Sequence, residues 1–277
     1  MTIAIWWIRR DLRVHDNPAL LAAHRTGLPV LPVFILDPSL LALNAPSRQA
    51  FLFGGLMELG KALTHQGARL LVRRGQPLQV LKKLVEESGA AVIYAEEDYS
   101  PYAVQRDKAV ARKVKLILVH GLGVHPPALV TKADGSTYTV FTPFSMVWKA
   151  LPFSNYTHPA PVSLPPLPSV KSEDIPANPT FDHFPAGEKE ALRRLDTFLS
   201  GPVRDYADAR NRMDLDGTSR LSPYLRFGMI SARQCAVAAL EAMATTSDAA
   251  ARRGAETWLN ELIWRDFYMA ILSHFPN

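Results

Sequence analysis

The stretch Ile3-Ala4-Ile5-Trp6-Trp7-Ile8 decides the fold class, because it is short and wholly apolar and charged residues follow it at once. A run of this kind is typical of a strand that is buried on both faces of a sheet. Four similar runs follow, at residues 30–36, 70–73, 91–94 and 116–119. Pro32, within the second run, counts against a strand there, because proline donates no hydrogen bond to a ladder.

The intervals between these runs carry helical patterns, at residues 17–25, 47–65, 78–87 and 102–113. Ser47 is a suitable N-cap for the second of these helices. Strands that alternate with helices predict a parallel sheet that is wrapped on both faces. With right-handed crossovers, residues 1–151 are therefore expected to form a doubly wound, Rossmann-like α/β domain.

Two weaker features complete this predicted domain. Asp134-Gly135 lies between two short extended runs and predicts a hairpin turn. Residues 143–151 predict a short helix that closes the domain. The chain has no Gly-x-Gly-x-x-Gly fingerprint after its first strand and no Walker A sequence, so a conventional dinucleotide or triphosphate site is not expected.

The composition changes at residue 152. Nine of the 22 prolines fall between residues 152 and 185, which predicts a semi-rigid, extended linker over residues 152–187. Helical patterns then resume at residues 188–200, 206–212, 231–244 and 255–275, with no strand signal among them. Residues 188–277 are therefore expected to be all-helical.

The overall charge is mildly basic, with 31 Lys and Arg against 26 Asp and Glu, which permits a polyanionic partner without requiring one. The single cysteine, Cys235, excludes an intrachain disulfide framework and a cysteine-rich metal site, and no metal is expected. No signal-peptide pattern opens the chain, and no apolar run approaches the ~20 residues that span a bilayer. We expect a soluble, cytoplasmic monomer.

Residues 258–268 show an unusual second face when they are placed on a helix with ~100° of rotation per residue. An ordinary core face is formed by Leu259, Leu262, Ile263 and Phe267. A separate arc of roughly 120° holds Trp258, Glu261, Trp264, Arg265 and Tyr268. This second face suits a pocket for a flat, partly anionic ligand. Packing of the aromatics under another helix, with a Glu261–Arg265 pair, explains the pattern equally well.

Three stretches together resemble the DNA photolyase and cryptochrome family. They are Trp7-Ile8-Arg9-Arg10-Asp11-Leu12-Arg13-Val14-His15-Asp16-Asn17-Pro18-Ala19-Leu20, residues 216–228 with Thr218-Ser219-Arg220-Leu221-Ser222, and the helix at residues 258–268. Val140-Phe141-Thr142-Pro143-Phe144 adds a weaker match. The resemblance covers the whole chain and is greatest to microbial class I cyclobutane pyrimidine dimer photolyases.

The resemblance implies a flavin adenine dinucleotide (FAD) in the helical domain and a second, light-harvesting chromophore in the α/β domain. The implied activity is light-dependent DNA repair, in which photoexcited, reduced FAD donates an electron to a pyrimidine dimer and the cyclobutane ring splits. Photolyases take their target base out of the stack. DNA that contains pyrimidine dimers is thus the expected partner, and association with the nucleoid is expected in use.

The resemblance also assigns roles to single residues. Thr218, Ser219, Arg220, Leu221 and Ser222 match the loop on the flavin diphosphate, a sensible combination of hydroxyls, backbone N–H groups and a cation around an anion. A simple helix N-cap with an unrelated arginine is the alternative for this loop. Tyr206 matches a position that touches the flavin. Arg210 matches a position that contacts DNA phosphate.

The helix at residues 258–268 matches the wall that faces the lesion. Trp264 is expected to stack on the dimer, and Glu261 is expected to hydrogen-bond its base edge. Arg265 matches a position on the cofactor's phosphates, and Tyr268 continues the DNA-facing surface. Stacking of a base on an aromatic ring contributes ~1–3 kcal/mol, enough to help hold a flipped-out dimer.

The second chromophore is expected beyond the carboxyl ends of the strands, where ligands bind in doubly wound sheets. These ends carry Arg9, Arg10, Asp37 and Glu96, with Ser100 nearby. Some folate-binding relatives have Glu around the position of Ser100, and its absence here counts against a folate. A deazaflavin, another flavin or an empty site are therefore the open alternatives, with a folate less favoured. The arginines either face an anionic chromophore or pair with Asp11, Asp37 or Glu96, and pairing is the favoured interpretation.

Family members continue well past a position such as Asn277, so the chain is predicted to be truncated at its C-terminus and inactive alone. The isolated chain is expected to bind flavin weakly or not at all. Two alternatives to dimer repair remain open, namely a cryptochrome-like blue-light photoreceptor and a non-catalytic antenna or nucleotide-binding module. The presence of both Glu261 and Trp264 favours repair.

Overall fold

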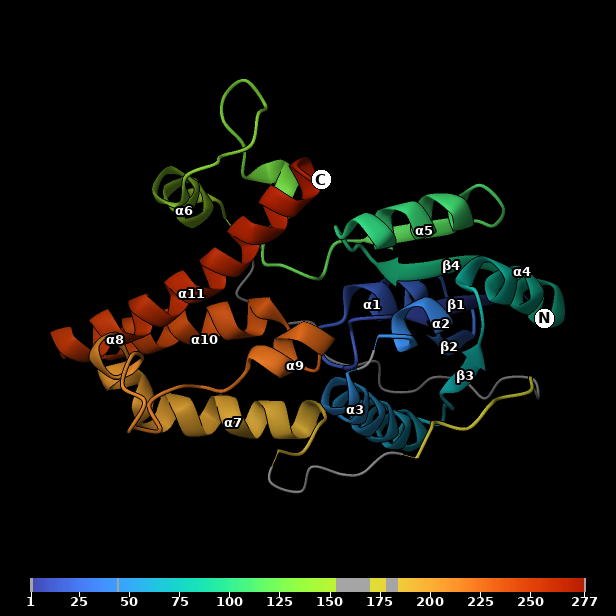
Figure 1. Ribbon diagram of the computed structural model, residues 1–277, viewed down its shortest axis with the longest axis horizontal. Coiled ribbons are helices and arrows are strands. Elements are labelled where there is room, and N and C mark those ends of the chain that lie inside the picture. Colours follow the sequence, from blue (N-terminus) through green and yellow to red (C-terminus); the bar gives the residue numbers. More distant parts are fainter. Residues whose placement is uncertain (1, 44, 153–169, 178–183, 277) are drawn as a thin grey trace.

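The computed structural model describes residues 2–43, 45–152, 170–177 and 184–276 (Figure 1). Its N-terminal half is built on one five-stranded parallel sheet with the strand order β3-β2-β1-β4-β5. The strands are β1 (Ile3–Ile8), β2 (Val30–Leu36), β3 (Leu71–Arg74), β4 (Ala90–Glu96) and β5 (Leu116–Val119). The predicted α/β class and all five predicted strands are confirmed.

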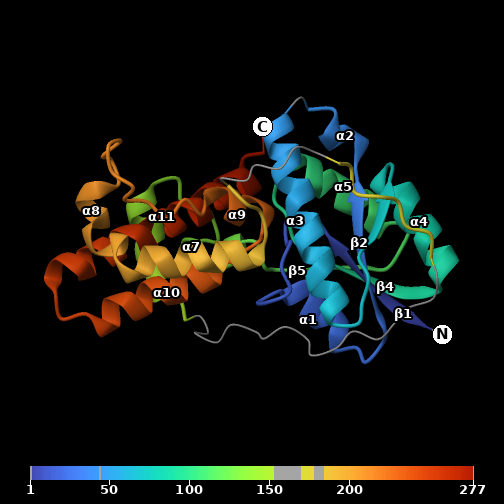
Figure 2. The ribbon, with the colours of Figure 1, turned by 90° about the horizontal axis from the view of Figure 1, so that it is seen from below.

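The two faces of the sheet have separate hydrophobic cores, and β1 contributes alternate residues to each. Trp6 joins the core under α1 (Pro18–His24) and α3 (Pro46–His65). Its neighbour Trp7 joins the core under α4 (Pro77–Ser88) and α5 (Pro101–Ala111). Figure 2 shows these helices around the sheet, which explains why β1 is apolar at every position.

Two local predictions need correction or explanation. Pro32 is accommodated inside β2 because the pairing with β3 begins only at Val33, so the strand has one neighbour at the proline. Ser47 is not the N-cap of α3. That helix begins at Pro46, with Ala45 as its N-cap, because a proline at the first helical position has the required φ and lacks only an N–H that would be unpaired there.

The second half is helical, and the part of it that the structure describes contains no strand. Its helices are α7 (Glu188–Ser200), the 3₁₀ helix η2 (Pro202–Asp205), α8 (Tyr206–Ala209), α9 (Ser222–Phe227), α10 (Ala232–Thr245) and α11 (Ala249–His274). Ser231 caps α10 with a capping box that it shares with Gln234. The helix α11 begins six residues earlier than predicted, because Asp248 caps it.

The helix α6 (Phe141–Ala150) differs from its predicted role. It was expected to close the α/β domain, but it packs against α11, beside which it lies in Figure 1. Phe144 meets Phe267 edge to face, and the indole N–H of Trp148 donates to Asp266 at 3.0 Å. This short helix therefore belongs spatially to the helical half, although it precedes the linker in sequence.

Other elements are short. They are α2 (Pro38–Leu41) and the 3₁₀ helix η1 (Pro127–Leu129). The predicted Asp134-Gly135 turn is present, with Gly135 at φ +80° and a single antiparallel bridge between Thr131 and Thr137. No helix in the described residues is long and apolar enough to cross a membrane.

Most of the predicted linker at residues 152–187 lies outside the described residues. One described stretch of it, residues 170–177, contacts the edge strand β3. The Glu173 N–H donates to the Val72 carbonyl at 2.8 Å, and the Val72 N–H donates to the Ser172 hydroxyl at 3.0 Å. This segment thus covers backbone groups that the edge of the sheet would otherwise expose.

Candidate functional site

The turn after β1 is held by one buried carboxylate, that of Asp11. This side chain accepts hydrogen bonds from the Trp6 indole at 2.8 Å, from the Arg9 N–H at 2.7 Å and from the Asn17 amide at 3.2 Å. Asn17 in turn caps α1 by accepting from the Leu20 N–H. The turn that contains Arg9, Arg10 and Asp11 is therefore held by hydrogen bonds within itself and to its two flanking elements, β1 and α1.

Arg13 connects this turn to the rest of the molecule, and it is 1% exposed. Its guanidinium pairs with Glu96 at the end of β4 (2.6 Å) and donates to the Gly228 carbonyl after α9 (3.1 Å). Burial raises the pKa of Glu96 to about 7, although the positive charge of Arg13 opposes this shift. Glu96 thus belongs to a contact between the two halves of the chain.

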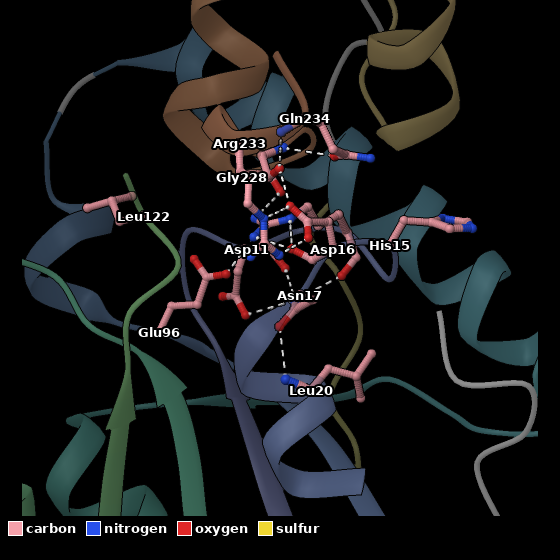
Figure 3. Close-up of polar contacts among 12 residues, drawn as sticks. Asp11, His15, Asp16, Asn17, Leu20, Glu96, Leu122, Gly228, Arg233 and Gln234 are labelled. Atoms are coloured by element: carbon pink, nitrogen blue, oxygen red, sulfur yellow. Dashed lines mark hydrogen bonds and ion pairs between the residues drawn. The ribbon is translucent and has the colours of Figure 1, made fainter. Parts of the chain in front are cut away.

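Asp16 completes the same contact from the other side of the turn. Its carboxylate accepts hydrogen bonds from Ser231 and Arg233 at the start of α10. Figure 3 shows Asp11, Asp16 and Glu96 gathered beside Gly228 and Arg233. We call this cluster, formed by Asp11, Arg13, Asp16, Glu96, Gly228, Ser231 and Arg233, the interdomain joint.

A cavity of about 570 Å³ lies beside this joint, within the size range of small-molecule sites. Its walls come from the carboxyl ends of β1 and β2, from α2, α3 and α5, and from α9 of the helical half. The apolar lining includes Phe34, Ile35, Leu40, Leu41, Leu52 and Phe227. The prediction of a site beyond the strand ends is thus supported by geometry, and the second half of the chain contributes one wall.

Arg9 and Arg10 both line this cavity and both pair with carboxylates, as favoured from the sequence. The partners differ from those expected. Arg9 pairs with Asp107 at 2.5 Å, and Arg10 pairs with Asp98 at 3.3 Å. Asp11 receives only the backbone N–H of Arg9. The expectation that Asp11, Asp37 or Glu96 would be the partner is therefore wrong for both arginines.

The cavity wall itself contains a largely buried excess of positive charge. Arg9 and Arg106 share the single carboxylate of Asp107, and both guanidiniums lie 4.8 Å from the ring centroid of Trp7. Burial and the nearby charge of Arg106 lower the pKa of Arg9. The N–H groups of Arg9 that lack hydrogen-bond partners are shielded from solvent, so cation–π contact with Trp7 is their main compensation.

The remaining predicted residues of this region divide between the two sites. Asp37 lines the cavity, caps α2 and accepts a hydrogen bond from the Tyr102 hydroxyl. Ser100 also lines the cavity. Glu96 does not line it, since its carboxylate is turned to Arg13 in the interdomain joint.

The second candidate region is one face of α11. Trp264 stacks in parallel on Phe141, with ring centroids 3.7 Å apart and an interplanar angle of 4°. Tyr268 stacks on the same indole with centroids 5.6 Å apart, and it is 62% exposed. These rings form an aromatic platform at the surface.

Charged groups lie one turn before this platform. Glu261 forms an ion pair with Arg210, which follows α8. Tyr206 at the start of α8 lies close enough for its pKa to be raised, first by burial and then by the charge of Glu261. The structure therefore brings together three residues that the sequence assigned separately to the flavin, to DNA and to the lesion.

Two members of the predicted second face of α11 have other surroundings. Trp258 is 4% exposed and packs on Phe198 with centroids 5.0 Å apart, so it is a core residue. Arg265 donates to the carbonyls of Leu122 (2.7 Å) and Leu225 (3.4 Å), and therefore links α11 to both halves of the chain. Its predicted contact with a cofactor phosphate stays a prediction.

The loop before α9 is mostly exposed. Thr218, Arg220 and Ser222 are exposed and Ser219 is half-buried, whereas Leu221 belongs to the hydrophobic core. Arg220 has a φ of +51°, and its guanidinium pairs with Asp216 at 2.9 Å. Several hydroxyls and a cation are thus presented on a loop that is anchored by one buried leucine.

Sequence reasoning missed several residues of these sites. Phe141 was quoted only as part of a motif, and its stacking on Trp264 depends on the position of α6. Arg48 and Arg226 line the cavity from α3 and α9, respectively. Neither carries a sequence signal, because each is an ordinary exposed arginine on its own helix. The Arg106-Asp107 pair on α5 offered the clearest missed signal, since Asp107 lies on the buried face of that helix.

Comparisons with known proteins agree with this architecture. The family model for DNA photolyase matches residues 4–166, more than half of the chain. A deoxyribodipyrimidine photo-lyase of Synechococcus sp. is 34% identical over 99% of this chain and 61% of the relative.

Two solved structures are also similar. A bacterial class III photolyase from Agrobacterium tumefaciens superposes with a TM-score of 0.88 at 29% identity, over the whole of this chain and 60% of that one. An archaeal photolyase from Sulfolobus tokodaii, which holds two FAD molecules, superposes with a TM-score of 0.79 at 25% identity, again over the whole of this chain and 60% of that one. The chain thus spans about three fifths of the length of these relatives.

Proposed function

The chain belongs to the DNA photolyase family, and from this premise we propose that it takes part in light-dependent repair of cyclobutane pyrimidine dimers in DNA. The curated relative from Synechococcus is a deoxyribodipyrimidine photo-lyase. The observation that carries the proposal is the arrangement on α11, where Glu261 pairs with Arg210 beside Tyr206, and Trp264 lies one turn later in the aromatic platform.

The donor groups of residues 218–222 fit the diphosphate of FAD. Thr218, Ser219 and Ser222 offer hydroxyls, and Arg220 offers a guanidinium whose only ion pair in the described part of the chain is an exposed one with Asp216. An exposed pair contributes little, so an anionic ligand can compete for the guanidinium. When bound there, reduced FAD supplies the photoexcited electron that the repair reaction needs.

The residues of α11 would bind the lesion. The Trp264 ring, held in plane by Phe141, offers a surface on which a flipped pyrimidine can stack. Glu261 offers a hydrogen-bond acceptor to the base edge, and its partner Arg210 offers a cation to the neighbouring DNA phosphate. The exposed phenol of Tyr268 extends the same surface.

The cavity beside the interdomain joint would hold a second, light-harvesting chromophore. It has an apolar interior with a few polar groups, which is typical of cofactor sites, and it lies beyond the carboxyl ends of the parallel strands. The Sulfolobus photolyase, with its two FAD molecules, is a precedent for a second cofactor in this family. The cytoplasmic location and monomeric state expected from the sequence stay predictions.

The test measures the binding of the purified protein to an oligonucleotide that contains one thymine dimer and to the undamaged oligonucleotide, followed by illumination with added reduced FAD. We expect tighter binding to the dimer-containing DNA, and no loss of the dimer, since the chain is expected to be inactive alone. Trp264→Ala should weaken the preference for dimer-containing over undamaged DNA by roughly tenfold or more, since one stacking contact is lost. Glu256→Gln, an exposed change on the same helix, is the control for Glu261→Gln.

The results separate the alternatives. Equal affinity for dimer-containing and undamaged DNA would contradict the proposed role in dimer repair, and light-dependent loss of the dimer would contradict the expectation that the chain is inactive alone. If Trp264→Ala kept the same preference for dimer-containing over undamaged DNA, the aromatic platform would not be the lesion site.

A further inference from the structure

Asp266 is a carboxylate on α11 that binds two segments from other parts of the chain, and it is 3% exposed. Its Oδ2 atom accepts hydrogen bonds from the backbone N–H groups of Val124 (2.9 Å) and His125 (3.3 Å), in the loop after β5. It also accepts one from the indole N–H of Trp148 on α6 (3.0 Å). A buried carboxylate is costly unless its oxygens are bonded, so its burial depends on these donors. One side chain thus fixes α11 both to α6 and to the α/β half.

A glycine lets the loop after β5 approach Asp266 closely. A Cβ added to Gly123 would lie 2.8 Å from Asp266 Oδ1 and 2.8 Å from Met269 Cε. Because glycine has no Cβ, the backbone comes near enough for the next two N–H groups to reach the carboxylate. Arg265 places its guanidinium 3.8 Å from the same Oδ1 atom. The surroundings of Asp266 therefore match an anionic acceptor.

The same carboxylate determines how α6 lies on α11. Phe141, Phe144 and Trp148 are spaced by three and four residues, so they share one face of α6. The first stacks on Trp264 with ring centroids 3.7 Å apart, and the second meets an aromatic ring of α11 edge to face. Ring contacts are favourable over a range of offsets, whereas a hydrogen bond is directional. The bond from Trp148 to Asp266 is therefore the contact that sets the register of α6.

We propose that Asp266 is a positioning residue for the lesion site, which holds Phe141 on Trp264 and thereby fixes the plane on which a flipped base stacks. This inference rests on the proposed role of Trp264 and adds the group that orients its indole. The carboxylate of Asp266 is bonded within the protein, so its effect on the lesion passes through the rings. The packing and hydrogen bonds around a binding residue decide how precisely that residue is held.

The experiment replaces Asp266 in the full chain and measures the preference for dimer-containing over undamaged DNA, well below the melting temperature of each variant. Asp266→Leu accepts no hydrogen bond, and it should lose roughly tenfold of this preference, as expected for Trp264→Ala. Asp266→Asn keeps an oxygen where the three donors meet, and it should stay within about threefold of the native preference. The double variant Asp266→Leu/Trp264→Ala should lose no more than Trp264→Ala alone, because both changes act on one contact.

Near-ultraviolet circular dichroism follows the indole without DNA. The contribution of Trp264 is the difference between the spectra of the native protein and Trp264→Phe, and it reflects the fixed rings around the indole. The same difference in the Asp266→Leu background should lose most of its intensity, because Phe141 and Trp264 are no longer held in one geometry. In the Asp266→Asn background the difference should remain.

Two further variants separate positioning from general stability. Trp148→Phe leaves Asp266 in place and keeps an aromatic ring but removes one donor, so its preference should lie between those of the native protein and Asp266→Leu. It also decides the question if Asp266→Leu does not fold. Leu259→Ala, a buried change about two turns before Asp266 on α11, is the matched control. It should lower the melting temperature and leave both the preference and the Trp264 contribution unchanged.

Two results would overturn the inference. If Asp266→Leu folds and keeps the native preference, Asp266 only supports the fold. If the preference is lost while the Trp264 contribution is unchanged, the effect does not pass through the indole. Equal affinity of the native protein for both DNAs would contradict the proposed function instead, and the dichroism of the variants would still decide whether Asp266 holds Trp264 in place.

Discussion

The turn after β1 and the loop before α9 both carry the family resemblance, but they differ in how their polar groups are used. In the turn, the side chains of Asp11, Arg13 and Asp16 are buried and bonded within the protein. In the loop, the hydroxyls and the Arg220 guanidinium face solvent. The comparison teaches that a motif can identify a family without being its ligand site, and that unused, exposed donors are the better guide to binding.

Substitution of Gly228 tests the turn most severely. This glycine has a φ of +65°, and an added Cβ would lie 1.8 Å from the Arg10 carbonyl oxygen. Gly228→Ala should therefore lower the free energy of unfolding by more than about 4 kcal/mol, measured by chemical denaturation. Gly27→Ala is the control, because Gly27 has a similar φ of +71° with nothing within 4 Å, and it should cost about 1 kcal/mol. Similar losses of free energy of unfolding in Gly228→Ala and Gly27→Ala would contradict the close approach of Gly228 to the Arg10 carbonyl.

Removal of Arg13 is expected to have the next largest effect. Arg13→Met should lower the free energy of unfolding by about 3–5 kcal/mol, since Glu96 and two backbone carbonyls lose a buried partner. The exposed pair between Arg253 and Asp208 provides the comparison, and Arg253→Met should have almost no effect. A small loss in Arg13→Met would mean that the joint does not hold the two halves together.

The protonation of Glu96 gives the joint a pH dependence. Its pKa is raised from 4.5 to about 7 by burial, so between these values the unfolded state ionises while the folded state keeps the proton. Its contribution to stability is therefore complete below pH 4.5 and is lost as pH rises through 7, by on the order of 3 kcal/mol. The difference in free energy of unfolding between the native protein and Glu96→Gln should decline over this window. A constant difference would show that Glu96 stays ionised.

The smallest effect on stability is expected in the exposed loop. Arg220→Ala should leave the melting temperature unchanged, because the Asp216 pair is exposed, but it should weaken FAD binding by roughly tenfold if the loop holds the diphosphate. Fluorescence titration with FAD measures this affinity, because it detects weak binding that dialysis would lose. If Arg220→Ala instead lowered the melting temperature strongly and left FAD binding unchanged, the loop before α9 would be a structural motif and not a ligand site.

Much of the fold followed from local patterns. The apolar runs and helical spacings placed every strand of the sheet and most of the helices, because burial on one or two faces leaves a period in the sequence. The errors occurred where another element decides the outcome. The predicted place of α6 was wrong because its aromatic face packs on α11, more than a hundred residues later in the chain.

The sequence by itself determined the α/β class, the helical second half and the motifs of the DNA photolyase family. Only the tertiary structure decided which charged groups of those motifs are bonded internally and which remain free. Arg9 pairs with Asp107, Arg13 with Glu96 and Asp16 with Arg233, each far away in the chain. Such pairs depend on how helices and strands pack against one another. The periodicity of a sequence shows which face of an element is buried, but it does not identify the residue of another element that packs against that face.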